Sequence, residues 1–307
     1  MEKIVLITGA SSGIGLFIAE YLSGNGYKVY AAARSYKNVE NTGGTEGKNG
    51  LEKLYMDVTD QASIDEAVKL IIAREGRLDV LINCAAIVLR GAVEDNGIGD
   101  YEKILATNFY GTLRACKSVL PFMRERKSGM IINFSSLNGI AAVPFLSGYA
   151  VSKFAVEGLS ETLSTEVKDF GIKVVIIEPG DHRGGSRSTR YQSEKAGSQV
   201  SPYFDPFSKT VERVEKDEAD GSDPALLAVK IRKIIENPKP RVRYKQMAAF
   251  EYLFVYFKKY LPGRAFEKLL CDYYFKDLVV FIPRDFIENP FQSIKNLFAR
   301  KKPDKPL

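Results

Sequence analysis

The chain has few residues of the kinds that hold metal ions or form disulfide bonds. Its 307 residues include one histidine, His182, and three cysteines, Cys84, Cys116 and Cys271, which lie far apart. Because no second histidine and no cysteine cluster could complete a ligand set, we expect no metal site. Scattered cysteines, odd in number and without a secretion signal, are typical of reduced thiols in the cytosol. We interpret His182 as a loop residue and Cys84 as a small buried hydrophobe.

We also expect neither a leader nor a membrane span. Met1-Glu2-Lys3 leads directly into a β-rich run, and this predicts a cytoplasmic protein without a signal peptide. Residues 128–152 carry no charge and are long enough for a span, but a proline, three glycines and several serines and asparagines interrupt them. A net charge of +6 and a pI of about 9.0 favour anionic ligands, but the charge is too diffuse to indicate nucleic acid as a partner.

The first motif present is a glycine-rich turn between a strand and a helix. Residues 3–8 are a short apolar run, typical of a buried parallel strand. Gly9, Gly13 and Gly15 follow with the spacing Gly-x-x-x-Gly-x-Gly, and an apolar helical pattern begins at once. Glycines let the backbone turn tightly and approach a pyrophosphate at the helix N-terminus. The arrangement predicts a dinucleotide-binding unit.

Tyr149 and Lys153 indicate the chemistry most directly. They lie one helical turn apart, so both project from one face of a predicted helix. A phenol in water loses its proton only at a pKa of about 10. A neighbouring ammonium favours the phenolate and brings proton transfer into working range near neutral pH. Ser136 lies just after the strand-like residues 130–134, where such sheets place ligand chemistry, and Asn108 is a mediocre helix former inside a predicted helix.

The pattern along the chain predicts an α/β fold. Apolar β-rich runs occur near residues 3–8, 27–33, 52–56, 79–84, 129–135 and 172–178, and helical patterns near 13–24, 60–75, 100–126 and 149–169. Strands that alternate with helices predict a doubly wound parallel sheet with helices on both faces. Asp223 and Pro224 begin a further helix to about Glu236, and residues 241–244 add a last strand, for about seven in total.

Together these motifs resemble the short-chain dehydrogenase/reductase family, whose members have a Rossmann-type fold. The resemblance is strong over residues 1–190 and weaker over 220–275, and it points toward members similar to hydroxysteroid and retinol dehydrogenases. It implies that the cofactor contacts Gly9, Ser11, Ser12, Gly13, Ile14 and Gly15 in the turn, Asp57 and Val58 on the adenine side, Asn83 and Ala85 in a sheet-stabilising motif, and Pro179 and Gly180 beside the nicotinamide. Ala86 replaces the usual glycine. No threonine follows Gly180 before Thr189, so which group orients the nicotinamide stays open.

The resemblance also implies a catalytic tetrad of Asn108, Ser136, Tyr149 and Lys153. Tyr149 would be the general acid or base, and Ser136 would hydrogen-bond the substrate oxygen. Lys153 would lower the tyrosine pKa and hold the nicotinamide ribose, and Asn108 would anchor a water that links Lys153 to solvent. The implied enzyme moves a hydride between a nicotinamide and a hydroxyl or carbonyl carbon of a small-molecule alcohol or ketone.

The end of the second strand predicts NADP(H) as the preferred cofactor, with NAD(H) possible. A site selective for NAD(H) has an acid there, which accepts from the ribose 2′-hydroxyl. This chain has Ala33 followed by Arg34. Arg34 can bind a 2′-phosphate and stack on adenine, while Ser11 or Ser12 can add a hydroxyl contact.

The second half of the chain suggests how the substrate is bound. Residues 181–222 are polar and are expected to form a mobile substrate loop within a catalytic domain of residues 1–275. Residues 250–282 are rich in aromatics, and residues 276–307 form an extension with a basic tail. The aromatics predict a bulky apolar substrate, such as a sterol, retinoid or fatty-acyl derivative.

Other interpretations of these residues stay open. The aromatics and the basic tail could instead form a peripheral membrane contact or a subunit interface, and we expect a homodimer or homotetramer. Two further interpretations are a membrane-associated enzyme that modifies lipids or sterols and a non-catalytic NADP-binding sensor or scaffold. The complete set of Ser136, Tyr149 and Lys153 argues against the sensor.

Overall fold

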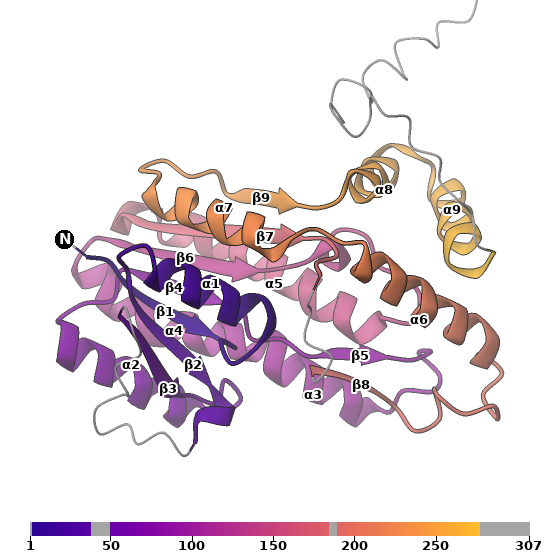
Figure 1. Ribbon diagram of the computed structural model, residues 1–307, viewed down its shortest axis with the longest axis horizontal. Coiled ribbons are helices and arrows are strands. Elements are labelled where there is room, and N and C mark those ends of the chain that lie inside the picture. Colours follow the sequence, from indigo (N-terminus) through magenta and orange to yellow (C-terminus); the bar gives the residue numbers. More distant parts are fainter. Residues whose placement is uncertain (1, 38–49, 184–188, 277–307) are drawn as a thin grey trace, which may run out of the picture.

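A seven-stranded parallel sheet forms the centre of the molecule, shown as a computed structural model in Figure 1. The structure describes residues 2–37, 50–183 and 189–276. Its strands are β1 (Ile4–Thr8), β2 (Lys28–Ala33), β3 (Leu51–Tyr55), β4 (Val80–Asn83), β6 (Gly129–Phe134), β7 (Ile172–Pro179) and β9 (Arg243–Gln246). The order across the sheet is β3-β2-β1-β4-β6-β7-β9, and every neighbouring pair is parallel. The predicted α/β fold is confirmed.

Helices cover both faces of this sheet. On one face lie α1 (Gly13–Ser23) and α7 (Pro224–Glu236), and on the other α2 (Gln61–Glu75), α4 (Tyr110–Glu125) and α5 (Ser147–Glu166). The described residues also form α3 (Ile98–Asn108), α6 (Phe204–Ala219), α8 (Ala249–Tyr260) and α9 (Gly263–Phe275). Alternate side chains of the strands face opposite sides. Leu6 packs on one side with Val68 of α2 and Val119 of α4. Ile7 packs on the other with Ile18 of α1 and Ile231 of α7.

The order of the strands places a ligand site beside β1. The chain fills the sheet outward from β1 in one direction with β2 and β3, and in the other with β4, β6, β7 and β9. In open α/β sheets, ligands bind beyond the carboxyl ends of the strands at this point of reversal. Helices α6, α8 and α9 lie together on the side toward which β9 points (Figure 1).

Two local expectations differ from the structure. The helix expected over 100–126 is two helices, α3 and α4, that meet at Phe109. Residues 181–222, expected as a loop, contain strand β8 (Arg190–Gln192), which pairs with β5 (Val88–Arg90), and the helix α6. The polar composition predicted a loop here because α6 buries only a few of its side chains, those of Phe207, Thr210 and Asp217. The basic tail and the apolar residues 278–282 lie outside the described residues.

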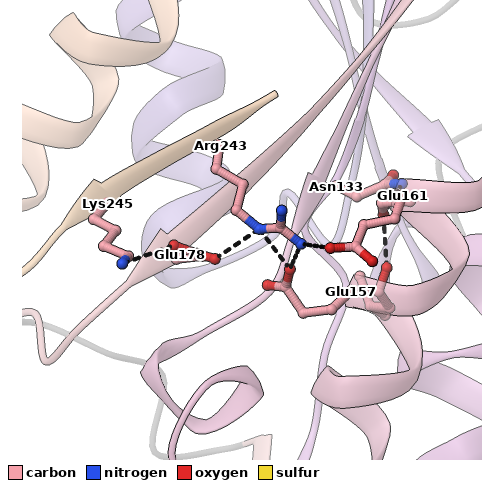
Figure 2. A network of polar contacts seen from close by, with 8 residues as sticks. Asn133, Glu157, Glu161, Glu178, Arg243 and Lys245 are labelled. Carbon is pink, nitrogen blue, oxygen red and sulfur yellow. Dashed lines mark hydrogen bonds and ion pairs between the residues drawn. The ribbon is translucent and has the colours of Figure 1, made fainter. Parts of the chain in front are cut away.

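An ionic network fastens the edge strand β9 to its neighbours (Figure 2). Arg243 of β9 contacts Glu178 of β7 at 3.2 Å (Nε to Oε1) and Glu157 of α5 at 3.0 Å, and it also pairs with Glu161. The Glu178 side chain is 2% exposed. Burial raises the pKa of Glu178 and the charge of Glu157 raises it further, while Lys245 and Arg243 oppose this. Arg243 therefore compensates a buried carboxylate and holds the strand that leads into α8.

Replacing Arg243 by methionine should lower the free energy of unfolding by roughly 1–3 kcal/mol, because a buried charged acceptor loses its partner. Urea unfolding of the variant measures this loss. The matched control is Arg232→Met, which breaks an exposed pair with Glu236 one turn away and should cost at most about 0.5 kcal/mol. Equal losses of unfolding free energy in the two variants would contradict the conclusion that the buried network stabilises the fold.

Candidate active site

The glycine turn after β1 is shaped so that no side chain fits at two of its positions. Gly9 has a φ of +69°, and a Cβ there would lie 2.6 Å from Cα of Ala85. A Cβ on Gly15 would lie 2.5 Å from the carbonyl oxygen of Gly9. The hydroxyl of Thr8 accepts from the backbone N–H groups of Cys84 and Ala85, both at 3.2 Å. The turn is thus packed against the end of β4 and presents bare backbone at the start of α1.

A cavity of about 470 Å³ runs from this turn across the carboxyl edge of the sheet. The predicted site residues that line it are Gly9, Ser11, Ser12, Gly13, Ile14, Gly15, Arg34, Val58, Ala85, Ser136, Tyr149, Lys153, Pro179 and Gly180. The strands β1, β2, β4, β6 and β7 all end at this cavity, which explains why residues far apart in sequence meet there.

Ser136, Tyr149 and Lys153 meet where β6 and α5 approach each other. Tyr149 and Lys153 lie in the first turns of α5, and Ser136 precedes a short 3₁₀ turn at Leu137–Gly139. The Nζ of Lys153 lies 5.5 Å from the centre of the Tyr149 ring and donates to the carbonyl oxygen of Phe134 at 2.8 Å. The lysine is therefore held at the end of β6, beside the phenol.

Burial is the main influence on the pKa values of Tyr149 and Lys153. Burial raises the pKa of Tyr149 to about 12, and the nearby Ser136 hydroxyl only partly opposes this shift. Burial also lowers the pKa of Lys153 to about 8. Burial is the largest cause of the shift on the phenol, because removing a charge from water is costly. The role of Lys153 in lowering the pKa of the phenol stays a prediction. The phenol thus keeps its proton at neutral pH.

Asn108 has a structural setting that its sequence position did not reveal. It is the last residue of α3, its side chain is buried, and it does not line the cavity. Its Oδ1 accepts from the N–H of Ile87 at 2.8 Å, and its Nδ2 donates to the carbonyl of Ile87 and to Ser152 Oγ, both at 2.9 Å. The amide thereby connects the loop after β4 to the first turns of α5. Its role in anchoring a water stays a prediction.

Asn83 and Asp57 also lie outside the cavity lining. Asn83 Nδ2 donates to Asn133 Oδ1 at 2.8 Å inside the sheet, which fits the sheet-stabilising part of the motif. The Asp57 carboxylate accepts from the N–H and the hydroxyl of Thr59, at 2.9 and 2.7 Å. The structure therefore does not bring these two side chains to the site, and the neighbouring Ala85 and Val58 line it instead.

The far end of the cavity contains the groups that a phosphorylated cofactor needs. Arg34 lines it and is exposed, with no acidic partner among the described residues. The hydroxyls of Ser11 and Ser35 lie along the same lining, and Ala33 contributes no carboxylate. At the other end, Ser135 Oγ and His182 Nε2 are buried polar atoms without a hydrogen-bond partner in the described part of the chain. Bare glycine backbone, a free guanidinium and two unpartnered polar atoms fit an extended dinucleotide.

His182 lies in the loop after β7, as expected, and its side chain is buried. Its Nδ1 lies 2.8 Å from the carbonyl oxygen of Gly180, and the ring lines the cavity. Burial lowers its pKa, so the ring is neutral at pH 7. Residues that no local sequence pattern identifies also line this end; they are Arg90, Val143, Leu146, Arg190, Val214, Glu218 and Tyr274. They come from several elements, and only the Asp181-His182 pair after the Pro-Gly turn offered a local signal.

The fold and the cavity define the class of protein as a dinucleotide-dependent oxidoreductase. A family model described as short chain dehydrogenase matches residues 3–195. A 3-ketodihydrosphingosine reductase of Bacteroides thetaiotaomicron is 40% identical over 272 residues, which are 89% of this chain and 98% of that protein. An oxidoreductase of Botryotinia fuckeliana is 37% identical and covers 79% of this chain, with 88% of its own length matched.

Solved structures agree with this assignment. A short-chain dehydrogenase from Streptomyces avermitilis matches with a TM-score of 0.70 and 29% identity, over 97% of this chain and 96% of that chain. A structure of ElxO with NADP bound matches with a TM-score of 0.63 and 27% identity, over 79% of this chain and 96% of that one. The chain belongs to the short-chain dehydrogenase family. It is an oxidoreductase that acts on CH–OH or C=O groups.

Two further observations concern membranes and metals. No helix in the described ranges is long and apolar enough to cross a bilayer. Within residues 2–37, 50–183 and 189–276, no three histidine, cysteine or acidic side chains are grouped so that they could hold a metal ion.

Proposed function

We propose that the protein is an NADP(H)-dependent reductase of a long-chain lipid ketone, with 3-ketodihydrosphingosine as its candidate substrate. The observation that carries the proposal is one continuous cavity, which extends from Arg34 and the glycine turn, past Tyr149, to Tyr274 of α9. The relative of Bacteroides thetaiotaomicron, matched over nearly its whole length, carries the name of that reaction. NADP bound to a structural neighbour supports the cofactor.

The apolar end of the cavity suits an alkyl chain. Val143, Leu146, Tyr273 and Tyr274 form a cluster with Phe254 and Phe266, and Tyr149 packs against it. A second, small cavity adjoins this end. Val143 and Tyr274 line both cavities, and Phe250, Phe254 and Leu270 line the second one. Pockets for hydrophobic ligands have such walls with a few fixed polar groups. An alkyl chain that follows this cluster would bring its carbonyl to Tyr149.

In the proposed reaction, Tyr149 acts as the acid. NADPH, when bound, supplies the hydride. As the carbonyl carbon is reduced, negative charge develops on its oxygen, and the Tyr149 hydroxyl donates its proton there. A pKa of about 12 keeps this proton on the phenol at neutral pH, as the reductive direction requires. Ser136 donates a hydrogen bond to the same oxygen. The Lys153 ammonium stabilises the phenolate that remains.

At the cofactor, each group has a separate task. The backbone of Gly9, Gly13 and Gly15 would pack against the pyrophosphate at the N-terminus of α1. Arg34 would bind the 2′-phosphate. Val58 and Ala85 would line the adenine and nicotinamide halves, and Pro179 and Gly180 would close the nicotinamide end.

A substrate panel tests the proposal. Consumption of NADPH should be measured with 3-ketodihydrosphingosine in detergent micelles, a short-chain ketone and a small ketose, each with the wild-type protein. We expect kcat/KM to be highest for the long-chain ketone, because only its chain can reach the cluster around Tyr274. Preference for the ketose, or no turnover of any long-chain ketone, would overturn the proposal.

A further inference from the structure

Four acidic side chains surround the substrate end of the cavity, and three of them are already satisfied. Glu218 pairs with Arg190 at 2.7 Å. Asp217 accepts from the hydroxyl of Tyr273 at 2.8 Å and pairs with Arg213 at 3.2 Å. Their charges are thus compensated within the protein.

Glu251 is satisfied in a different way. Its Oε1 accepts from the N–H of Asp181 at 2.6 Å, and its Oε2 accepts from the N–H of Ala248 at 2.5 Å. This carboxylate fills the space beside Gly180, where a Cβ would lie 2.2 Å from it. It therefore caps α8 and fixes the backbone that follows the Pro-Gly turn.

The fourth, Asp181, is held by its backbone, while its carboxylate has no hydrogen bond or ion pair among the described residues. The backbone N–H is bound by Glu251, and the carbonyl accepts from Ser222 at 2.9 Å. Burial, with repulsion from Glu251, raises the pKa of Asp181 well above its usual range. A carboxyl in this setting gains most from a cation that enters the cavity.

Asp181 also stands at the junction of the two parts of the site. It lines the main cavity with Tyr149, and it lines the adjoining small cavity with Phe254 and Tyr274. The charge of Asp181 is one of the smaller causes that raise the pKa of the Tyr149 phenol, which lines the same cavity. Two arginines of the described lining at this end are already paired, Arg90 with Glu215 at 3.0 Å and Arg190 with Glu218.

We propose that Asp181 binds the ammonium group of the substrate and selects ketones that carry a protonated amine beside the carbonyl. This inference rests on the proposed function, since 3-ketodihydrosphingosine is a long-chain ketone with an amino group on the carbon next to its carbonyl. With the alkyl chain on the cluster of α8 and α9 and the carbonyl at Tyr149, the ammonium faces Asp181. The cavity thus recognises three features of the substrate: chain, carbonyl and charge.

The test compares two substrates that differ only in the amine. These are 3-ketodihydrosphingosine and the same long-chain hydroxyketone without its amino group, each assayed with NADPH in the same micelles. Wild-type protein should show a kcat/KM at least about tenfold higher for the amino ketone, because a charge-assisted hydrogen bond contributes that much. Asp181→Asn keeps the shape and removes the charge, so it should reduce this ratio about tenfold or more, mainly through KM. Asp220→Asn removes an exposed charge at the end of α6 and should leave the ratio unchanged.

The outcomes separate this inference from the proposed function. Equal turnover of both ketones by wild-type protein overturns ammonium binding but leaves the lipid ketone reductase standing. Turnover of neither overturns the proposed function itself. Equal turnover by the wild-type protein overturns the inference even where Asp181→Asn fails to fold. An Asp181→Asn protein that folds and keeps the wild-type ratio overturns the assignment to Asp181.

Discussion

A Tyr149→Phe protein should reduce its ketone with a kcat lower by roughly 10²–10⁴-fold, while its affinity for NADPH stays close to that of the wild type. The substitution removes one hydroxyl and keeps the ring that packs against the aromatic cluster. The substrate oxygen then loses the phenol that α5 places beside Lys153, and the other phenol of the described lining, Tyr274, belongs to α9. Steady-state kinetics and calorimetric titration with NADPH measure the two quantities separately.

The matched control is Tyr27→Phe. Tyr27 is also a tyrosine with a pKa raised to about 12 by burial, but its hydroxyl donates to Glu236 at 3.2 Å, away from the cavity. Its loss should leave kcat unchanged. A Tyr149→Phe protein with near-normal turnover would require a different acid and would remove the basis of the mechanism.

Replacing Arg34 by alanine should raise the Kd for NADPH by roughly 10–100-fold, because a charge-assisted contact with the 2′-phosphate is lost. The Kd for NADH should change little, since that cofactor has no phosphate at this position. Wild-type protein should accordingly bind NADPH more tightly than NADH. The reason lies in the exposed guanidinium next to Ala33, where the described lining of the cavity has no carboxylate to repel a phosphate.

Salt gives an independent check on this assignment. The preference for NADPH should decrease as ionic strength rises, because an exposed guanidinium–phosphate contact is screened. The charge-conserving Arg34→Lys variant should keep part of the preference. Equal affinity of wild-type protein for both cofactors, or an Arg34→Ala variant with unchanged NADPH affinity, would rule out Arg34 as the selective residue.

Local motifs made most of the fold and the cofactor end predictable. Gly9 and Gly15 are needed because Ala85 and the backbone of Gly9 itself leave no space for a Cβ, and such close contacts follow from a strand–turn–helix pattern. Tyr149 and Lys153 share a helix face by spacing alone. Ser136 meets them because it follows a strand that ends at the same sheet edge.

The features of the site that could not be predicted from the sequence depend on packing between segments that lie far apart along the chain. Among the described residues the Asp181 carboxylate has no hydrogen bond, while Glu251, from α8, accepts from the Asp181 backbone N–H. The sign of the pKa shift on Tyr149 depends on how completely its surroundings exclude water, and spacing does not encode this. Nothing in the sequence indicated that the Asn108 amide binds Ile87 and Ser152, and the predicted catalytic role of Asn108 stays a prediction.

The most direct test of the central claim follows the hydride itself. Purified protein should be incubated with 3-ketodihydrosphingosine and NADPH that carries deuterium at both C4 positions of the nicotinamide, and the product analysed by mass spectrometry. We expect an alcohol that is heavier by one deuterium, with the label on the former carbonyl carbon, and no such product from Tyr149→Phe in the same time. A product without deuterium, or no alcohol at all from the wild-type protein, would contradict the account.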